Sequence, residues 1–172
     1  KNLYFFGGMV MILGNLLIAI APKDMFYYGI AFSIIGTGFF KPNVSSMVGE
    51  LYHEDDPRRD AGYGMFYAGI NIGGFLGGIL CIYLGKYYSW QLCFLASAIV
   101  MVLGLLTFLF TKNKLGPIGN SPLSHLPKTK RLTKEILVYA LSLLSIPLIF
   151  IMVKNTDYTD YFMYTIGPLA II

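Results

Sequence analysis

The feature that most constrains this sequence is a series of apolar blocks, each close to the length that a helix needs to cross a bilayer. Of 172 residues, 56% are hydrophobic and 13% are charged, whereas a soluble domain carries about 25% charged residues. About 20 apolar residues in a helix cross the hydrocarbon layer, where backbone polar groups find no external partner. Barrel strands would instead alternate apolar and polar residues over about 10 positions. The sequence therefore predicts an all-α membrane protein.

The chain divides at a polar stretch over residues 112–134, which holds three prolines and six basic residues. We expect residues 1–111 to form part of one helical bundle. Residues 112–134 are expected to be a cytoplasmic linker, and residues 135–172 a truncated helical hairpin. The six predicted spans cover about residues 3–21, 25–51, 61–84, 90–111, 135–153 and 158–172.

Basic residues are unevenly shared between the two sides of the predicted bundle. Nine lie on the side that holds Lys1 and the loops 52–60 and 112–134, and the other side holds Lys23, Lys86 and Lys154. The positive-inside rule places the richer side in the cytoplasm. We therefore predict a multi-pass protein of the inner cell membrane. Because its basic residues flank apolar spans, we expect no nucleic-acid partner.

Lys41 is a charged residue deep inside the second predicted span. An ammonium at that depth costs at least a few kcal/mol and normally faces water or a carboxylate. Ser33, Thr37, Lys41 and Ser45 recur at i+4 and are expected to share one polar helix face. Snorkelling to the interface is the alternative. Lys41 lies about 15 Å from Leu51 along a helix, too deep for that, so we predict a functional role.

Asn71 and Tyr67 are candidate binding residues in the third predicted span. Together with Tyr63 they follow i+4 spacing, which defines a second polar face. An amide in this position could bind a substrate, or could only join helices through a bond of about 1 kcal/mol. Both interpretations of Asn71 stay open. Gly69, Gly73 and Gly77 on the same helix predict that a neighbouring helix approaches closely.

Other reactive side chains do not form a catalytic or metal-binding pattern. Both histidines lie in predicted cytoplasmic loops, and no nucleophile–base pair is available, so we expect neither an enzyme nor a metal site. Cys81 and Cys93 lack metal-ligand spacing and are expected to be buried free thiols. The charged loop before the third span ends in Arg58, Arg59 and Asp60, which are candidates for cytoplasmic gate contacts.

These residues resemble the proton-dependent oligopeptide transporters. The stretch from Gly36 to Gly49, which contains Lys41, is similar to the fourth helix of that family. Arg58 to Tyr63 is similar to the loop that enters the fifth helix, and Tyr63 to Phe75 fits the family signature. The resemblance covers about residues 30–112.

The resemblance implies part of a major-facilitator fold of twelve helices. The four spans before the linker would be family helices three to six, and residues 135–172 would be a hairpin inserted between the two bundles. In the alternative assignment, residues 135–153 are the seventh helix of the family. They lack the aromatic-rich Phe-Glu-Gln ending that the family leads us to expect at the end of that helix. The Glu-x-x-Glu-Arg motif of helix one is not in this sequence, so we expect the chain to be a fragment that cannot transport alone.

The resemblance also implies a function and two residue roles. It implies proton-coupled symport of di- and tripeptides by alternating access, with no cofactor other than the coupling proton. Lys41 would serve proton coupling and bind the peptide carboxylate, and Asn71 would bind the peptide backbone. Tyr67 is included as a candidate binding residue only because its i+4 spacing puts it on the same helix face as Asn71; the resemblance implies no role for it. The expected partners are the peptide, the lipid bilayer and the rest of the transporter. The alternatives are the same fold with another solute, such as nitrate, and a structural membrane subunit that transports nothing.

Overall fold

The computed structural model describes residues 2–20, 23–53, 55–116, 118–119 and 128–155, and a few single positions up to residue 164. The regular structure in this described part is helical throughout, which confirms the predicted all-α class. The elements are α1 (Asn2–Ile20), α2 (Lys23–Glu50), α3 (Arg58–Tyr87), α4 (Trp90–Thr111), the short 3-10 helix η1 (Lys112–Leu115), α5 (Lys128–Leu144) and α6 (Ile146–Lys154).

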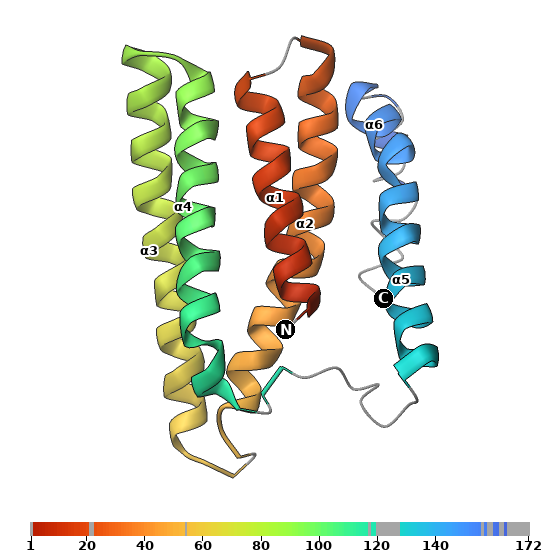
Figure 1. Ribbon diagram of the computed structural model, residues 1–172. Helices are drawn as coiled ribbons and strands as arrows, with labels where there is room; N and C mark the ends of the chain where they lie inside the picture. The colour runs from red at the N-terminus through yellow and green to blue at the C-terminus, as the bar shows by residue number, and fades with distance from the viewer. Residues whose placement is uncertain are drawn as a thin grey trace.

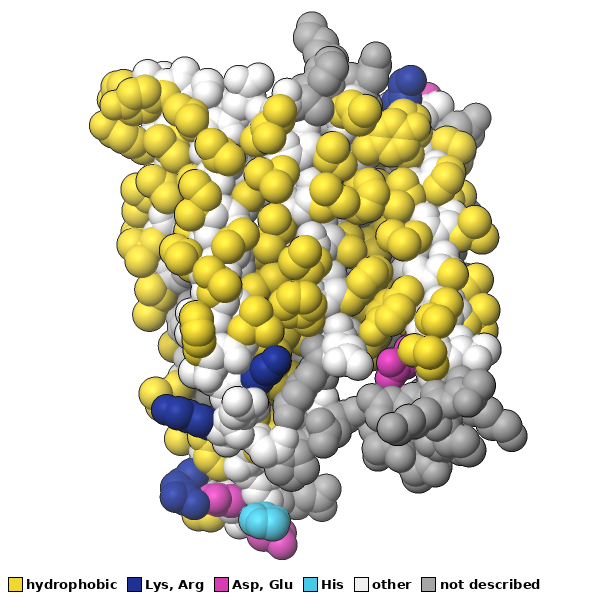
Figure 2. All heavy atoms as spheres, viewed as in Figure 1, with side chains coloured by type: hydrophobic (Ala, Val, Ile, Leu, Met, Phe, Trp, Pro, Cys, Tyr) yellow, Lys and Arg dark blue, Asp and Glu magenta, His cyan; other side chains and the backbone are white. Residues whose placement is uncertain are grey.

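The helices stand side by side, with α1 and α2 in the middle, α3 and α4 on one side, and α5 and α6 on the other (Figure 1). Helix α1 packs on both α2 and α4. In the described part of the chain, four segments are long and apolar enough to cross a membrane: Asn2–Ile20, Arg58–Tyr87, Trp90–Leu115 and Leu132–Lys154. Hydrophobic side chains cover the middle of the face shown in Figure 2, and most of the charged side chains lie near its two ends. This distribution is the one that a membrane-spanning bundle requires.

Helix α2 has 28 residues but is not among those four segments. The mean hydropathy of α2 is lowered by its tyrosines and glycines and by Lys41 and Pro42. It nevertheless runs antiparallel to both α1 and α3 (Figure 1), so it spans the same layer as they do. A spanning helix of low apolarity is best accommodated where protein or water, rather than lipid, covers part of its surface.

Glycines bring α1 and α2 into backbone contact at two levels. A Cβ added to Gly36 would stand 2.7 Å from the Gly7 carbonyl oxygen, and one added to Gly14 would stand 2.7 Å from that of Gly29. Gly7 and Gly29 face equally close backbone atoms in return. Small residues allow this approach between membrane helices. The close packing of α1 on α2 therefore depends on residues that present no side chain.

The glycines of α3 behave differently from those of α1 and α2. Among the described residues nothing lies within 4 Å of a Cβ added to Gly69, Gly73 or Gly77. The close neighbour predicted for this stripe is therefore not supplied by the described helices of this chain.

Cys81 and Cys93 form a disulfide between α3 and α4, with their Cα atoms 4.7 Å apart. The prediction of two free thiols was wrong. The turn between the helices ends with Ser89, whose hydroxyl oxygen accepts a hydrogen bond from the Leu92 amide at 3.3 Å. The tight antiparallel hairpin brings together two cysteines that lie twelve positions apart in sequence. They lie towards the end of the bundle that the distribution of basic residues predicts to lie away from the cytoplasm, where disulfides persist.

We expect the full-length protein, isolated without reductant and denatured in SDS, to show neither cysteine reactive towards a maleimide. Dithiothreitol should expose both thiols, and Cys81→Ser should leave Cys93 reactive without any reductant. The readout is the mass of peptides that contain Cys81 or Cys93 after labelling. Equal labelling of the wild-type protein with and without dithiothreitol would show that the thiols are free.

The helix predicted over residues 135–153 is divided into α5 and α6. The division falls at Ser145, whose hydroxyl donates to the Ser142 carbonyl at 2.6 Å, and a proline follows at the start of α6. Proline has no amide hydrogen and is tolerated in a first helical turn. Residues 158–172, predicted as a further helix, lie almost entirely outside the described part of the chain.

Candidate functional site

Two tyrosines, one in α3 and one just beyond the end of α2, connect these helices at the end predicted to be cytoplasmic. The Tyr63 hydroxyl donates to the Ser45 carbonyl oxygen at 3.4 Å and occupies the space that a side chain at Gly49 would need. The Tyr52 ring lies in the same way against Gly62. We call this contact the α2–α3 seam. Because it locks both helices at one level, it sets their register along the bundle.

The seam places the candidate residues at matching depths. The helices run antiparallel, so Lys41 lies one turn outward from Ser45, and Tyr67 lies one turn outward from Tyr63. Four helical residues advance about 6 Å, which puts Lys41 and Tyr67 at about the same level. Asn71 lies a further turn outward, level with Thr37. Sequence spacing identified these residues separately on each helix, and the seam brings the two sets to the same level.

Lys41 is exposed on the surface of the described helices. The ion pair found in the described part of the chain joins Arg58 to Asp56, and no described carboxylate pairs with Lys41. A lysine at this depth is not stable against lipid without a partner or water. We therefore expect the Lys41 side chain to face an aqueous cavity or protein other than the described helices.

Asn71 and Tyr67 are also exposed, and 53% of the Tyr67 surface is accessible. The Asn71 amide nitrogen donates to the Tyr67 carbonyl oxygen at 3.0 Å. An asparagine amide has two hydrogens and an oxygen acceptor, so one hydrogen and the oxygen stay available. The described helices do not make the interhelical bond that was the alternative role for this residue. The remaining groups can pair with a ligand that offers both a donor and an acceptor.

The polar stripe of α2 does not lie on a single face, in contrast to the expectation. The Ser33 hydroxyl is buried against α1, next to Gly14, whereas Thr37 and Lys41 are exposed. The physical reason is the helical repeat: a step of four residues overshoots a full turn by about 40°. Ser33 and Lys41 therefore point in directions that differ by about 80°, and only the cytoplasmic half of the stripe can contribute to a site.

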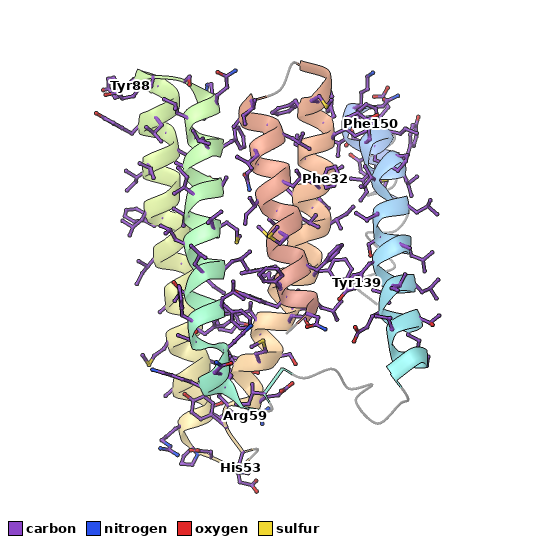
Figure 3. The ribbon with its side chains drawn as sticks, viewed as in Figure 1. Phe32, His53, Arg59, Tyr88, Tyr139 and Phe150 are labelled. Carbon is purple, nitrogen blue, oxygen red and sulfur yellow. A yellow bond between two sulfur atoms is a disulfide. The ribbon has the colours of Figure 1, made fainter. Side chains whose placement is uncertain are left out.

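The predicted gate residues lie at the start of α3, and Figure 3 shows Arg59 at the lower end of the bundle. The Arg58 guanidinium binds the Asp56 carboxylate through two nitrogens at 3.1 and 2.9 Å. Arg59 lies beside the seam, 3.9 Å from the position of a Cβ at Gly49. Asp60 is exposed in the first turn of α3, where a negative charge complements the helix dipole. The gate role of Arg58, Arg59 and Asp60 stays a prediction.

One contact in this region had no sequence signal. The Glu50 carboxylate accepts a hydrogen bond from the Gly119 amide at 2.7 Å. Met47 also lies against Gly119, which has a positive φ of 70°. The two positions joined by this bond are 69 residues apart, so no local pattern could reveal them. This contact ties the linker to the cytoplasmic end of α2.

The Asp56 carboxylate gives this end a pH dependence. The Arg58 side chain, followed by the Arg58 amide, holds the pKa of the Asp56 carboxyl below its usual range. A lowered folded-state pKa means that the interaction contributes stability above the unfolded pKa of about 4. That contribution is lost as pH falls through the folded pKa.

We expect amide hydrogen exchange of the segment 53–60, corrected for intrinsic rates, to stay constant between pH 7 and pH 5. It should accelerate at lower pH, when Asp56 is protonated. Asp56→Ala should show the faster exchange already at pH 7. Identical exchange in Asp56→Ala and wild type would mean that the carboxylate does not hold this turn.

The comparisons with known proteins agree on one family. Residues 1–138 match the POT family. The chain is 43% identical over 122 residues to an uncharacterized transporter, YclF, of Bacillus subtilis, and 32% identical over 124 residues to dipeptide and tripeptide permease A of Proteus mirabilis. These matches cover 70% and 71% of this chain and 25% of each relative. The chain thus spans about a quarter of the length of these relatives.

The fold leads to the same family. A crystal structure of a peptide transporter, POT, in complex with sulfate superposes with a TM-score of 0.72 at 32% identity. The superposition covers 99% of this chain and 35% of that one. The chain therefore has part of the major-facilitator type of fold, and its relatives are transporters rather than enzymes. It is a multi-pass inner-membrane protein, and it belongs to the POT family.

Proposed function

We propose that the full-length protein is a proton-coupled symporter of di- and tripeptides that works by alternating access. The observation that carries the proposal is the position of Lys41. It is an exposed ammonium deep in the span of α2, unpaired among the described residues and level with Tyr67 on α3. A transporter of charged, polar cargo needs such a group on the wall of its pathway.

Lys41 can serve both the peptide and the proton. Its ammonium attracts the carboxylate end of a peptide. Only the protonated amine carries the charge that attracts this carboxylate. Binding of the peptide carboxylate and protonation of Lys41 therefore promote each other. This mutual dependence is the physical basis of symport in the proposal.

Asn71 and Tyr67 complete this part of the proposed site. The amide oxygen of Asn71 and its second hydrogen match the N–H and C=O groups of a peptide bond. Tyr67 adds an aromatic surface and a hydroxyl one turn closer to the cytoplasm. Contacts with the peptide backbone do not depend on the side chains of the peptide. The remainder of the same transporter would supply the opposite wall, and the proton would be the only coupling ion.

The relatives support peptides as the cargo and also provide the alternative. One is described as a dipeptide and tripeptide permease. A crystal structure of a POT family transporter that resembles this chain at a TM-score of 0.73 contains 5-aminolevulinic acid. That observation favours a second candidate, the same fold with another small solute that also carries an amine and a carboxylate.

The test is uptake of labelled dialanine by the full-length protein in proteoliposomes, with and without an inward proton gradient. We expect accumulation only with the gradient, loss of accumulation with a protonophore, and competition by unlabelled dipeptide but not by nitrate. Gradient-driven accumulation of labelled 5-aminolevulinic acid without dialanine uptake would support the second candidate. Absence of uptake of either solute in a correctly inserted protein would contradict both.

A further inference from the structure

A second candidate site lies on the cytoplasmic half of the bundle, away from Lys41. It is a groove of about 540 Å³ between α1, α4 and α5. Most of its lining is apolar, and Phe5, Met9, Phe108 and Tyr139 contribute to it. Tyr139 of α5 extends towards α1 (Figure 3), where its ring lies 4.5 Å from that of Phe6. The groove is therefore an open one, lined by helices that come from both sides of the linker.

The polar groups of the groove gather at one end. Asn2 and Lys112 line it, and they lie at the start of α1 and just beyond the end of α4, both at the cytoplasmic interface. From there Phe5 and Met9 follow on α1 at helical spacing, and Phe108 follows on α4. Seven helical residues advance about 10 Å. The groove thus has a basic end at the interface, formed by Asn2 and Lys112, and continues into the membrane as an apolar channel along Phe5, Met9 and Phe108.

We propose that this groove binds an anionic phospholipid of the cytoplasmic leaflet. The ammonium of Lys112 and the amide of Asn2 would hold the phosphate, and one acyl chain would lie along Phe5, Met9 and Phe108. The charge at the basic end is complementary to an anionic headgroup, and basic pockets between helices on this side of a membrane suit such lipids. A soluble anion would leave the apolar channel unused. The inference does not depend on which solute the protein transports.

The first test compares lipid retention by the full-length protein in native mass spectrometry, after exchange into micelles that contain phosphatidylglycerol or phosphatidylcholine. We expect one phosphatidylglycerol to be retained in preference to phosphatidylcholine. Lys112→Gln should weaken its retention about fivefold, as expected for one basic residue at the membrane surface. Lys114→Gln is the matched control, because Lys114 lies two positions further on but does not line the groove, and it should retain the lipid.

The second test fills the apolar channel. Met9 lines the groove, and Leu13 lies one turn further along α1 but does not; both are about half exposed. Met9→Trp should lower the retention of phosphatidylglycerol, and Leu13→Trp should not. Three results would each overturn the proposal: equal retention of the two lipids, equal effects of Lys112→Gln and Lys114→Gln, or no effect of Met9→Trp.

Discussion

Substitution of Lys41 by alanine is expected to abolish dipeptide uptake driven by a proton gradient in the full-length transporter. The ammonium is exposed and unpaired among the described residues, at a depth where its hydration has to come from a cavity. Alanine removes both the charge proposed to attract a peptide carboxylate and the group proposed to take up and release the proton. Accumulation in proteoliposomes should therefore fall to the level of empty liposomes.

Two further variants separate charge from proton exchange. Lys41→Arg keeps a positive charge, but an arginine does not release its proton in proteins. It should retain dipeptide binding and lose gradient-driven accumulation. Lys86→Ala is the control, because it removes an exposed lysine from the last turn of α3, far from Lys41. This variant should transport as the wild type does. Full accumulation by Lys41→Ala would leave Lys41 a structural charge. If Asn71→Ala were also fully active, the whole α2–α3 wall would be structural.

Substitution of Gly36 by alanine is expected to destabilise the protein more than any other single-methyl change in α2. The added Cβ would stand 2.7 Å from the Gly7 carbonyl oxygen and 2.8 Å from the Met11 amide nitrogen. These are backbone atoms of α1 and cannot rotate away, so the two helices have to separate. Overpacking of this kind costs about 1–3 kcal/mol, and Gly36→Leu should exceed the effect of alanine.

The measurement is the apparent Tm of the full-length protein in detergent, followed by size-exclusion chromatography after heating. Gly38→Ala is the matched control on the same helix, because no described atom lies within 4 Å of its added Cβ. We expect Gly38→Ala to stay close to wild type while Gly36→Ala falls clearly below it. Equal Tm values for the two variants would show that α1 and α2 do not touch at Gly36.

Several of these results could be anticipated from particular residues. Runs of apolar residues identified the membrane helices, and Lys41 and Asn71 were conspicuous because polar groups are costly in an apolar span. The contacts that position them could not be anticipated in this way. Tyr63 binds a backbone carbonyl of Ser45, and Glu50 binds the Gly119 amide. Every residue type has a backbone carbonyl, and every residue type except proline has an amide hydrogen, so the sequence does not reveal which position supplies such a partner.

The glycines show the same limit. Those of α3 form the more regular pattern, yet the described helices leave them open, while Gly7, Gly14, Gly29 and Gly36 form the tight pair. Small residues permit close approach but do not specify which helix approaches. The cysteines are a similar case, since their pairing depends on how the α3–α4 hairpin aligns its two helices.

The sequence by itself determined that this chain is a set of membrane helices and which polar residues lie within them, and it predicts which end of the bundle lies in the cytoplasm. Each of these depends on the cost of transferring individual residues into lipid, which is additive along the chain. Only the tertiary structure decided which helices pack together, that Cys81 meets Cys93, and that Tyr63 of α3 contacts Ser45 of α2. These depend on distances between segments far apart in sequence, which no local pattern encodes.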